Sequence, residues 1–434
     1  MVQFLCGAAK ADITPKEEWL PWVPGFMGEA YGGVIHPVHV RVIAVKKGEQ
    51  LILLLGYEML ILFTAEQLTE SLRRQFDIPE ENIMIFCTHN HLSPVVKPTN
   101  STDKTGEYSR IYLEFLEKQT LNAAKEAISK LCPAKMGIGF GKSYINVNRN
   151  KDYRIRNDDG TTKIQTFIGM NYEGITDKTL SLIRFEDMDG RPIAFFMNHP
   201  THATVCAQTE KFGGKQGICS DFPGFVCTLM EEKFKGSVAL WSSGAAGDQN
   251  PIWTGCWFGP DERSGAATVR SNGPDSTEMT KNLAAIHYDD IINLNRDIVC
   301  REDVYVLAAK KSASITPGRK ITYEDPGDFM SPVLSVEPEG GIYQIPMQLI
   351  RIGDVSLIGI GGELYASLGL YLKENVQCPN PVVVTHTGAH TVGYILDDDG
   401  IARGCHGYRQ SAIRPGYVKE SLLKTVNLMA DHCQ

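Results

Sequence analysis

The stretch IMIFCTHNHLSP, residues 83–94, joins a short apolar run to two histidines, His89 and His91. An apolar run of this length is typical of a buried strand. In an extended chain, residues i and i+2 point to the same side, so both imidazoles would project from one face where the strand ends. The pattern alone leaves open whether the pair supplies two metal ligands, one ligand and a neighbour, or two surface residues.

Four other apolar runs also end in polar, potentially reactive residues. These are His199 and His202 after 193–198, Asp248 and Asn250 after 237–243, Glu363 after 355–360, and His386, His390 and Tyr394 at the end of 382–387 and just beyond it. In α/β sheets, ligands gather at the carboxyl ends of strands, where loops converge. The five strand ends therefore predict one shared site, and their nitrogen and oxygen donors suit zinc.

The rest of the chain alternates between strand-like and helix-like segments. Apolar residues recur with helical spacing in 65–76, 108–131, 223–234, 276–295, 364–375 and 417–431. Strand-like runs are 40–47, 50–57, 135–148, 179–187, 304–315 and 341–353, and 179–187 with 193–198 reads as a hairpin. This order predicts an α/β fold. The polar stretch 254–275 reads as a loop.

Composition narrows the class of protein. The chain has 434 residues, 43% of them hydrophobic, and a formal charge of −8 without a basic cluster, which argues against nucleic acid as a partner. The most apolar segment, 51–63, is too short to cross a bilayer, so we expect no membrane insertion. Eleven scattered cysteines and the lack of a signal-like start predict free thiols in the cytoplasm. Oligomeric state has no visible signal.

Several motifs together resemble a known family. They are GAAKADITP (7–15), THNH (88–91), NHPTHAT (198–204), SDFPG (220–224), SGAAGDQNP (243–251), GGE (361–363) and GY (393–394). In this order they resemble the catalytic domain of the neutral ceramidases, zinc enzymes that cleave an N-acyl amide. The resemblance implies an α/β fold with mixed β-sheets packed between helices, in one neutral-ceramidase-like catalytic domain over residues 1–434 without a separate C-terminal domain.

The same resemblance implies roles for individual residues. Zinc would be bound by His89, His199, Glu363 and Tyr394, with His91, Arg149 and Tyr408 as catalytic groups beside it. His91, which is separated from the ligand His89 by one residue, would act as general base or acid. From the chemistry of the residues themselves, we further expect Asp248 to fix a histidine or an active-site loop, and Gln249 and Asn250 to hold the substrate amide. We expect Arg409 to contact an anionic part of the substrate.

One departure from the family pattern shapes the predicted chemistry. Asn250 in GDQNP occupies the place of a serine that takes part in catalysis in the family. Without that hydroxyl, we expect a zinc-dependent hydrolase that cleaves the linear C–N bond of a small soluble N-acyl amide with metal-bound water. A metal-dependent lyase or isomerase with His91 as base, an ester or lactone hydrolase, and a binding protein without activity remain alternatives.

Overall fold

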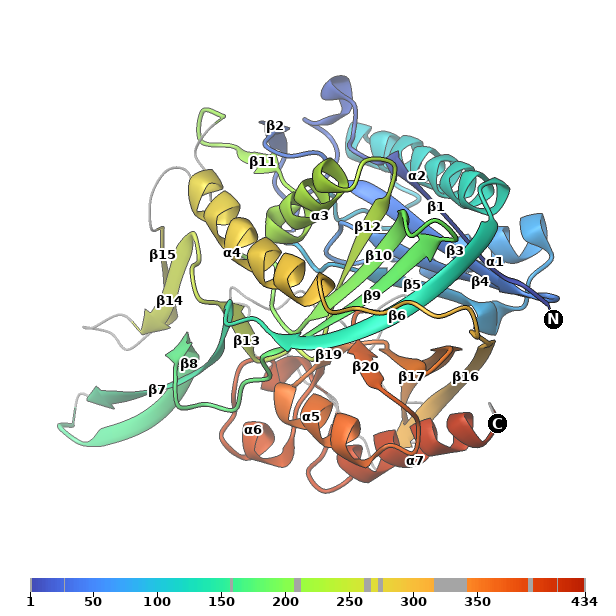
Figure 1. The fold of residues 1–434 in the computed structure, drawn as a ribbon. Helices are drawn as coiled ribbons and strands as arrows, with labels where there is room; N and C mark the ends of the chain where they lie inside the picture. Colours follow the sequence, from blue (N-terminus) through green and yellow to red (C-terminus); the bar gives the residue numbers. More distant parts are fainter. Residues whose placement is uncertain are drawn as a thin grey trace.

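A computed structural model describes residues 2–26, 28–156, 159–206, 212–260, 267–271, 276–315, 342–388, 393–411 and 413–432. Two β-sheets pack face to face, and helices cover their outer faces, so the core has four layers (Figure 1). This architecture confirms the predicted α/β class with mixed sheets between helices.

The larger sheet has eight strands in the order β12-β10-β9-β6-β1-β3-β4-β5. They are β1 (Phe4–Asp12), β3 (His39–Lys47), β4 (Gln50–Tyr57), β5 (Ile83–Cys87), β6 (Cys132–Lys142), β9 (Thr179–Asp187), β10 (Pro192–His199) and β12 (Val238–Ser243). The pairs β4–β5 and β10–β12 are parallel, whereas the other neighbours are antiparallel. The expected hairpin is formed by β9 and β10.

The smaller sheet has four strands in the order β16-β17-β18-β20. They are β16 (Val306–Ile315), β17 (Tyr343–Ile352), β18 (Val355–Ile360) and β20 (Pro381–Val384), of which β18 and β20 are parallel. The layer between the sheets is apolar: Phe86 and Phe196 from the larger sheet lie in one cluster with Leu357 and Val384 from the smaller one. Strands that are buried on both faces, such as β18 and β20, have largely apolar sequences without alternation.

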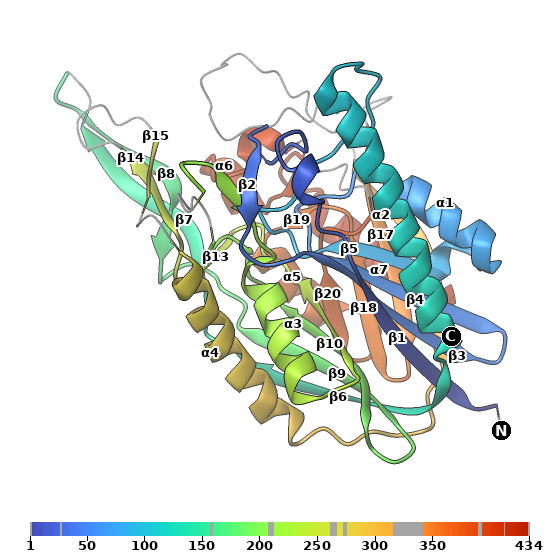
Figure 2. The same ribbon diagram turned by 90° about the horizontal axis from the view of Figure 1, so that it is seen from above.

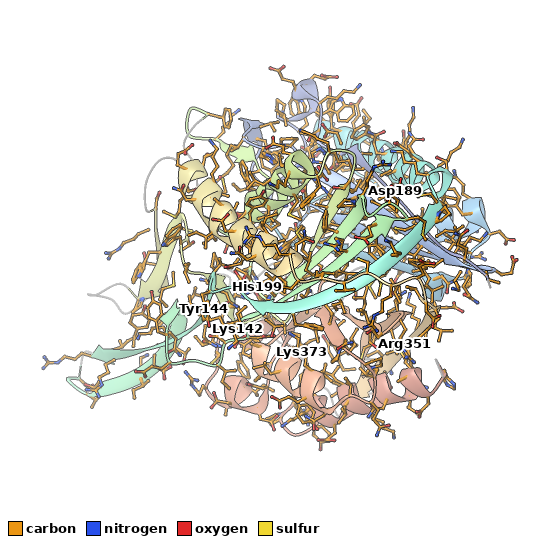
Figure 3. All side chains as sticks on the ribbon, viewed as in Figure 1. Lys142, Tyr144, Asp189, His199, Arg351 and Lys373 are labelled. Carbon is orange, nitrogen blue, oxygen red and sulfur yellow. The ribbon has the colours of Figure 1, made fainter. Side chains whose placement is uncertain are left out.

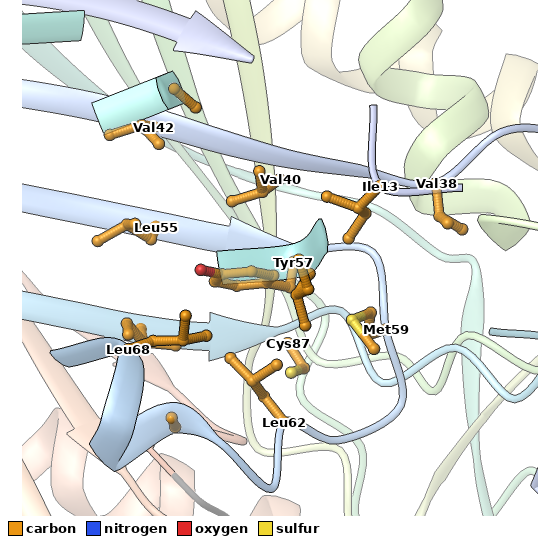
Figure 4. Packing of buried hydrophobic residues seen from close by; sticks show 14 of the residues in the cluster. Ile13, Val38, Val40, Val42, Leu55, Tyr57, Met59, Leu62, Leu68 and Cys87 are labelled. Atoms are coloured by element: carbon orange, nitrogen blue, oxygen red, sulfur yellow. The ribbon is translucent and has the colours of Figure 1, made fainter. Parts of the chain in front are cut away.

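Helices bury the two outer faces. The larger sheet carries α1 (Ala65–Phe76), α2 (Lys104–Ser129), α3 (Asp221–Lys233) and α4 (Thr277–Asn295), and the smaller one α5 (Ala366–Asn375) and α7 (Val418–His432) (Figure 2). Leu55 and Tyr57 of β4 and Leu68 of α1 belong to one packed cluster (Figure 4). Within the described residues, no helix has the length and apolar character needed to cross a membrane.

The remaining elements are small sheets and helical turns. They are β2 (Tyr31–Val34) with β11 (Gln216–Ile218), β7 (Asn146–Arg156) with β8 (Thr162–Asn171) and β13 (Gln249–Pro251), β14 (Cys256–Pro260) with β15 (Ala267–Ser271), β19 (Glu363–Leu364) with β21 (Tyr394–Ile395), and the helical turns η1 (Glu17–Trp19), η2 (Glu80–Asn82), α6 (Asp398–Ala402) and η4 (Tyr408–Gln410). The pairing of β19 with β21 sets Glu363 beside Tyr394.

Two local predictions were wrong. The run 135–148 is two strands, β6 and β7, which pair with different partners: β6 with β9 in the larger sheet, and β7 with β8 and β13 outside it. The stretch 254–275, expected as a loop, contains the β14–β15 hairpin. Strand β1 went unpredicted because its Ala- and Gly-rich sequence has low strand propensity, yet it pairs with β3 along its whole length.

Candidate metal centre

The carboxyl ends of strands from both sheets meet at one place. His89 follows β5, His202 follows β10, Glu363 follows β18, and His386 follows β20. The ring centroids of His89 and His202 are 4.9 Å apart, and those of His89 and His386 are 3.9 Å apart. The convergence expected from the strand ends is therefore confirmed for these four residues.

Backbone carbonyls set which ring nitrogen carries the proton in two of the histidines. His202 Nδ1 lies 2.7 Å from Ala246 O, and His89 Nδ1 lies 3.0 Å from Leu60 O. A carbonyl can only accept, so each Nδ1 must donate, and each neutral ring then presents an unprotonated Nε2. This is the arrangement in which proteins hold metal-binding histidines.

Both Nε2 atoms face the same carboxylate oxygen. Glu363 Oε2 lies 3.4 Å from His89 Nε2 and 3.2 Å from His202 Nε2. Three lone pairs thus converge in a buried place, which is unfavourable unless a cation lies among them. Two ligands about 2.0–2.1 Å from a tetrahedral zinc ion would lie about 3.3–3.4 Å apart. The observed separations fit that geometry.

His91 adds a third imidazole to this group. One ligand nitrogen from each of His89, His91 and His202 lies within 4.8 Å of the other two. His91 Nε2 is buried and has no hydrogen-bond partner among the described residues. Burial, followed by the neighbouring His89, holds the pKa of His91 well below its usual value, so the ring is a neutral acceptor. Phe26 meets its ring edge-on, with centroids 4.9 Å apart.

A second group of polar side chains borders Glu363 on its other side. Arg149 Nη2 donates to Tyr394 Oη (3.0 Å) and lies 4.0 Å from Glu363 Oε2. The Tyr394 hydroxyl also hydrogen-bonds Glu363 and lies 3.2 Å from His406 Nε2. Burial raises the pKa of Tyr394 well above its usual value, so the side chain is a neutral phenol that can donate a proton in a hydrogen bond.

The position of Tyr394 depends on a glycine. Gly407 has φ +83°, and a Cβ at this position would lie 2.2 Å from Cγ of the Tyr394 ring. A side chain at residue 407 would therefore displace Tyr394, and an L-residue would also be strained in this conformation. The sequence GCHG thus places His406 and Tyr394 against each other.

The loop after β12 supports the site instead of entering it. Asp248 accepts from Ala366 N and from Asn148 Nδ2 (both 2.8 Å), and its main-chain oxygen accepts from Arg149 N (2.8 Å). Burial raises the pKa of Asp248 to about 6. Of the two expected roles, fixing a loop agrees with these contacts.

The two residues after Asp248 form different contacts. Gln249 donates through Nε2 to Ile175 O (3.0 Å), whereas its Oε1 has no hydrogen-bond partner among the described residues. Asn250 accepts from Arg149 Nη1 at 3.4 Å. Asn250 therefore belongs to the surroundings of Arg149.

His199 does not join the cluster, contrary to the predicted ligand set. Its Nδ1 lies 2.7 Å from Thr201 Oγ1 and its Nε2 lies 3.0 Å from Ser143 O, so both ring nitrogens are already hydrogen-bonded. His199, labelled in Figure 3, is the last residue of β10, and its ring lies 5.2 Å from that of His287 of α4 between centroids. His202, three residues later, lies beside Glu363 in its place.

Three predicted positions give less information. The side chain of Arg409 and the whole of His390 lie outside the described residues. Tyr408 begins η4 and packs against the hydrophobic cluster of the smaller sheet. Conversely, His406 was not predicted, since a single histidine in GCHGY follows no strand and matches no spacing rule.

The architecture has known counterparts among solved structures. The chain shares its fold with neutral ceramidase. The enzyme from Pseudomonas aeruginosa superposes with a TM-score of 0.70 over 99% of this chain and 74% of that chain, at 16% sequence identity. A structure described as ceramidase complexed with C2 superposes with a TM-score of 0.70 over 99% of this chain and 75% of that one, at 15% identity. No protein-family model and no curated protein matches the sequence.

Proposed function

We propose that this protein is a zinc-dependent hydrolase of a small N-acyl amide, with residues 1–434 acting as one catalytic unit. The observation that carries the proposal is the convergence of two unprotonated imidazole nitrogens on the carboxylate of Glu363. The shared fold with neutral ceramidase favours an amide as substrate over other carbonyl compounds.

The donor set fits a zinc ion in its chemistry and its spacing. We assign His89, His202 and Glu363 as ligands, so that His202 replaces His199 in the set expected from the sequence. These are nitrogen and oxygen donors, as in catalytic zinc sites that keep one position open. Zinc, when bound, lowers the pKa of water and polarises a carbonyl group.

His91 serves as the proton acceptor and later as the donor to the leaving amine. Its ring is neutral, and its buried Nε2 has no hydrogen-bond partner among the described residues. A general base has to lie within hydrogen-bond reach of the proton that it takes, and His91 is next to the ligand nitrogens. A role as a further ligand is the alternative, and the metal content of a His91 variant separates the two.

Tyr394 and Arg149 stabilise negative charge that develops on the substrate oxygen. The neutral phenol can turn its hydroxyl from Glu363 towards that oxygen, and Arg149 beside it adds a positive charge. Arg149 also donates to Gly247 O (2.6 Å) and to Asn250, so its guanidinium is held in place by protein groups. These contacts weigh against Arg149 as a receptor for a substrate carboxylate.

Asn250 makes an acyl-enzyme route improbable on chemical grounds, because an amide side chain lacks a nucleophilic hydroxyl. Water is then the nucleophile. The test is hydrolysis of a panel of N-acyl amino acids and simple amides in H₂¹⁸O, with metal content measured on the same samples. One ¹⁸O atom in the released acid of zinc-loaded protein supports the proposal. Protein without zinc affinity, or solvent deuterium at carbon without hydrolysis, would refute it, the latter in favour of a lyase or isomerase.

A further inference from the structure

His386 is a buried histidine beside the metal centre to which the proposed reaction assigns no role. Its ring lies parallel to that of His89, with an interplanar angle of 10° and centroids 3.9 Å apart. The other ring pairs around His89 are nearly perpendicular and wider, at 4.9 Å for His202 and 5.2 Å for His91. The face of the His89 ring is therefore covered by His386.

The backbone of the same two residues is unusual. His89 has φ +61° and His386 has φ +57°, and only three other non-glycine residues of the described chain have positive φ. Histidine tolerates this left-handed conformation better than most residues, yet it persists mainly where the surroundings impose it. Both partners of the stack are thus held by their main chains in the orientation that brings the rings together.

Main-chain hydrogen bonds explain how His386 is held. Its carbonyl oxygen accepts from Cys87 N (3.2 Å), two residues before His89, and its amide donates to Gly362 O (3.3 Å), one residue before Glu363. Next to it, Thr387 forms an isolated bridge with Phe86 of β5. His386 is therefore joined to the chain segments of two proposed ligands, one from each sheet.

We infer that His386 is a positioning residue that fixes the plane of the His89 ring. The bond from His89 Nδ1 to Leu60 O sets the rotation of the ring within its plane, and the stack with His386 sets the plane itself. Together the two contacts leave one direction for Nε2, which is towards Glu363. Ligand groups need this kind of support to hold a productive geometry.

The chemistry of the stack also favours the metal-bound state. A cation on Nε2 withdraws electrons from the His89 ring, and the π-face of the stacked aromatic ring against it is then attractive. An aromatic ring at residue 386 should suffice for this effect. The inference rests on the proposed function for its zinc readout but not for its second readout, which uses protein without metal.

The experiment compares His386→Ala, which removes the ring, with His386→Phe, which keeps a flat ring. Zinc affinity is measured by competition with a chelating dye, and the His89 imidazole is observed by NMR in metal-free, histidine-labelled protein. We expect zinc affinity to fall about 10–100-fold in the alanine variant, with recovery to within about threefold in the phenylalanine variant. The Hε1 and Hδ2 signals of His89 should move in the alanine variant, because a stacked ring shifts them.

Outcomes that overturn the inference are distinct from those that overturn the zinc proposal. Unchanged zinc affinity and unchanged His89 signals in the alanine variant would reject a positioning role. Equal losses in both variants would show that the ring stack is not what matters. If the wild-type protein binds no zinc, the proposed function fails, while the His89 signals still decide whether His386 orients that ring.

Discussion

The choice between His202 and His199 as a metal ligand can be tested by opposite effects of two alanine variants. Structural zinc sites with four ligands bind with an apparent free energy of about 10–16 kcal/mol, so one ligand contributes about 2.5–4 kcal/mol. His202→Ala should therefore weaken zinc binding by about 10²–10³-fold. His199→Ala leaves the proposed ligands in place, so its zinc affinity should stay within about threefold of the wild-type value.

The stability of the metal-free protein should respond in the reverse order. His199→Ala removes the contacts to Thr201 and Ser143 and opens a cavity beside His287, which together cost about 2–4 kcal/mol of unfolding free energy. His202→Ala loses one bond to Ala246 O but also removes a lone pair that faces the Glu363 carboxylate. For His202→Ala we therefore expect the unfolding free energy to fall by only about 1 kcal/mol.

Two measurements on each variant complete this test. Chelator competition gives the zinc affinity, and urea unfolding of metal-free protein gives the stability. Zinc binding that survives in His202→Ala and disappears in His199→Ala would refute the assignment. If both variants lose zinc affinity and stability to the same extent, zinc binding depends on the integrity of the core in general. That result would also contradict the assignment of His202 as the ligand.

Four further expectations follow from the site. His91→Ala should keep its zinc while kcat falls by about 10²–10⁴-fold, and loss of zinc would instead make His91 a ligand. Tyr394→Phe should lower kcat about 10²–10³-fold at unchanged metal content, and a change confined to KM would argue against oxyanion stabilisation. Glu363→Gln should abolish the thermal shift caused by zinc and raise the unfolding free energy of metal-free protein by about 1 kcal/mol, since an amide can donate where the carboxylate repels; lower stability would contradict this. Between pH 6.5 and 4.5, the unfolding free energy of metal-free protein should decrease as the pH is lowered, by about 1.4 kcal/mol per pH unit for each histidine of lowered pKa, because the unfolded chain binds protons that the folded chain does not. These histidines are His91, His199 (about 4), His202 (about 3), His287 and His406, and the raised pKa values of Asp221 and Asp248 (both about 6) offset part of the slope. Urea titrations across this range measure it, and a flat profile would contradict it.

Much of the fold could be predicted because local and global signals agree. Buried parallel strands such as β5 and β12 are continuous apolar runs, and helix α1 was predicted with its observed bounds, 65–76. Strand β1 could not be predicted, because its pairing with β3 overrides a weak local preference.

The site was predictable as a set of strand ends but not as a set of ligands. Alternation in β10 sends Asn198 towards Val383 O in the smaller sheet and His199 towards α4. The residue that reaches the site emerges only after the turn at Pro200, and sequence does not reveal how many residues that turn uses. His406 was missed for a related reason, since it is brought in by tertiary packing from the region after α6.

The division of the proposed ligands between the two sheets has a consequence for biosynthesis. His89 and His202 come from the larger sheet, whereas Glu363 and Tyr394 come after strands of the smaller one, and Arg149 reaches Tyr394 across 245 positions of the chain. A ribosome-bound chain that stops before residue 363 therefore has no complete place for the ion. Zinc would bind only after nearly the whole polypeptide has been made and the two sheets have packed together. A bound zinc ion would therefore indicate a chain that has been synthesised and folded.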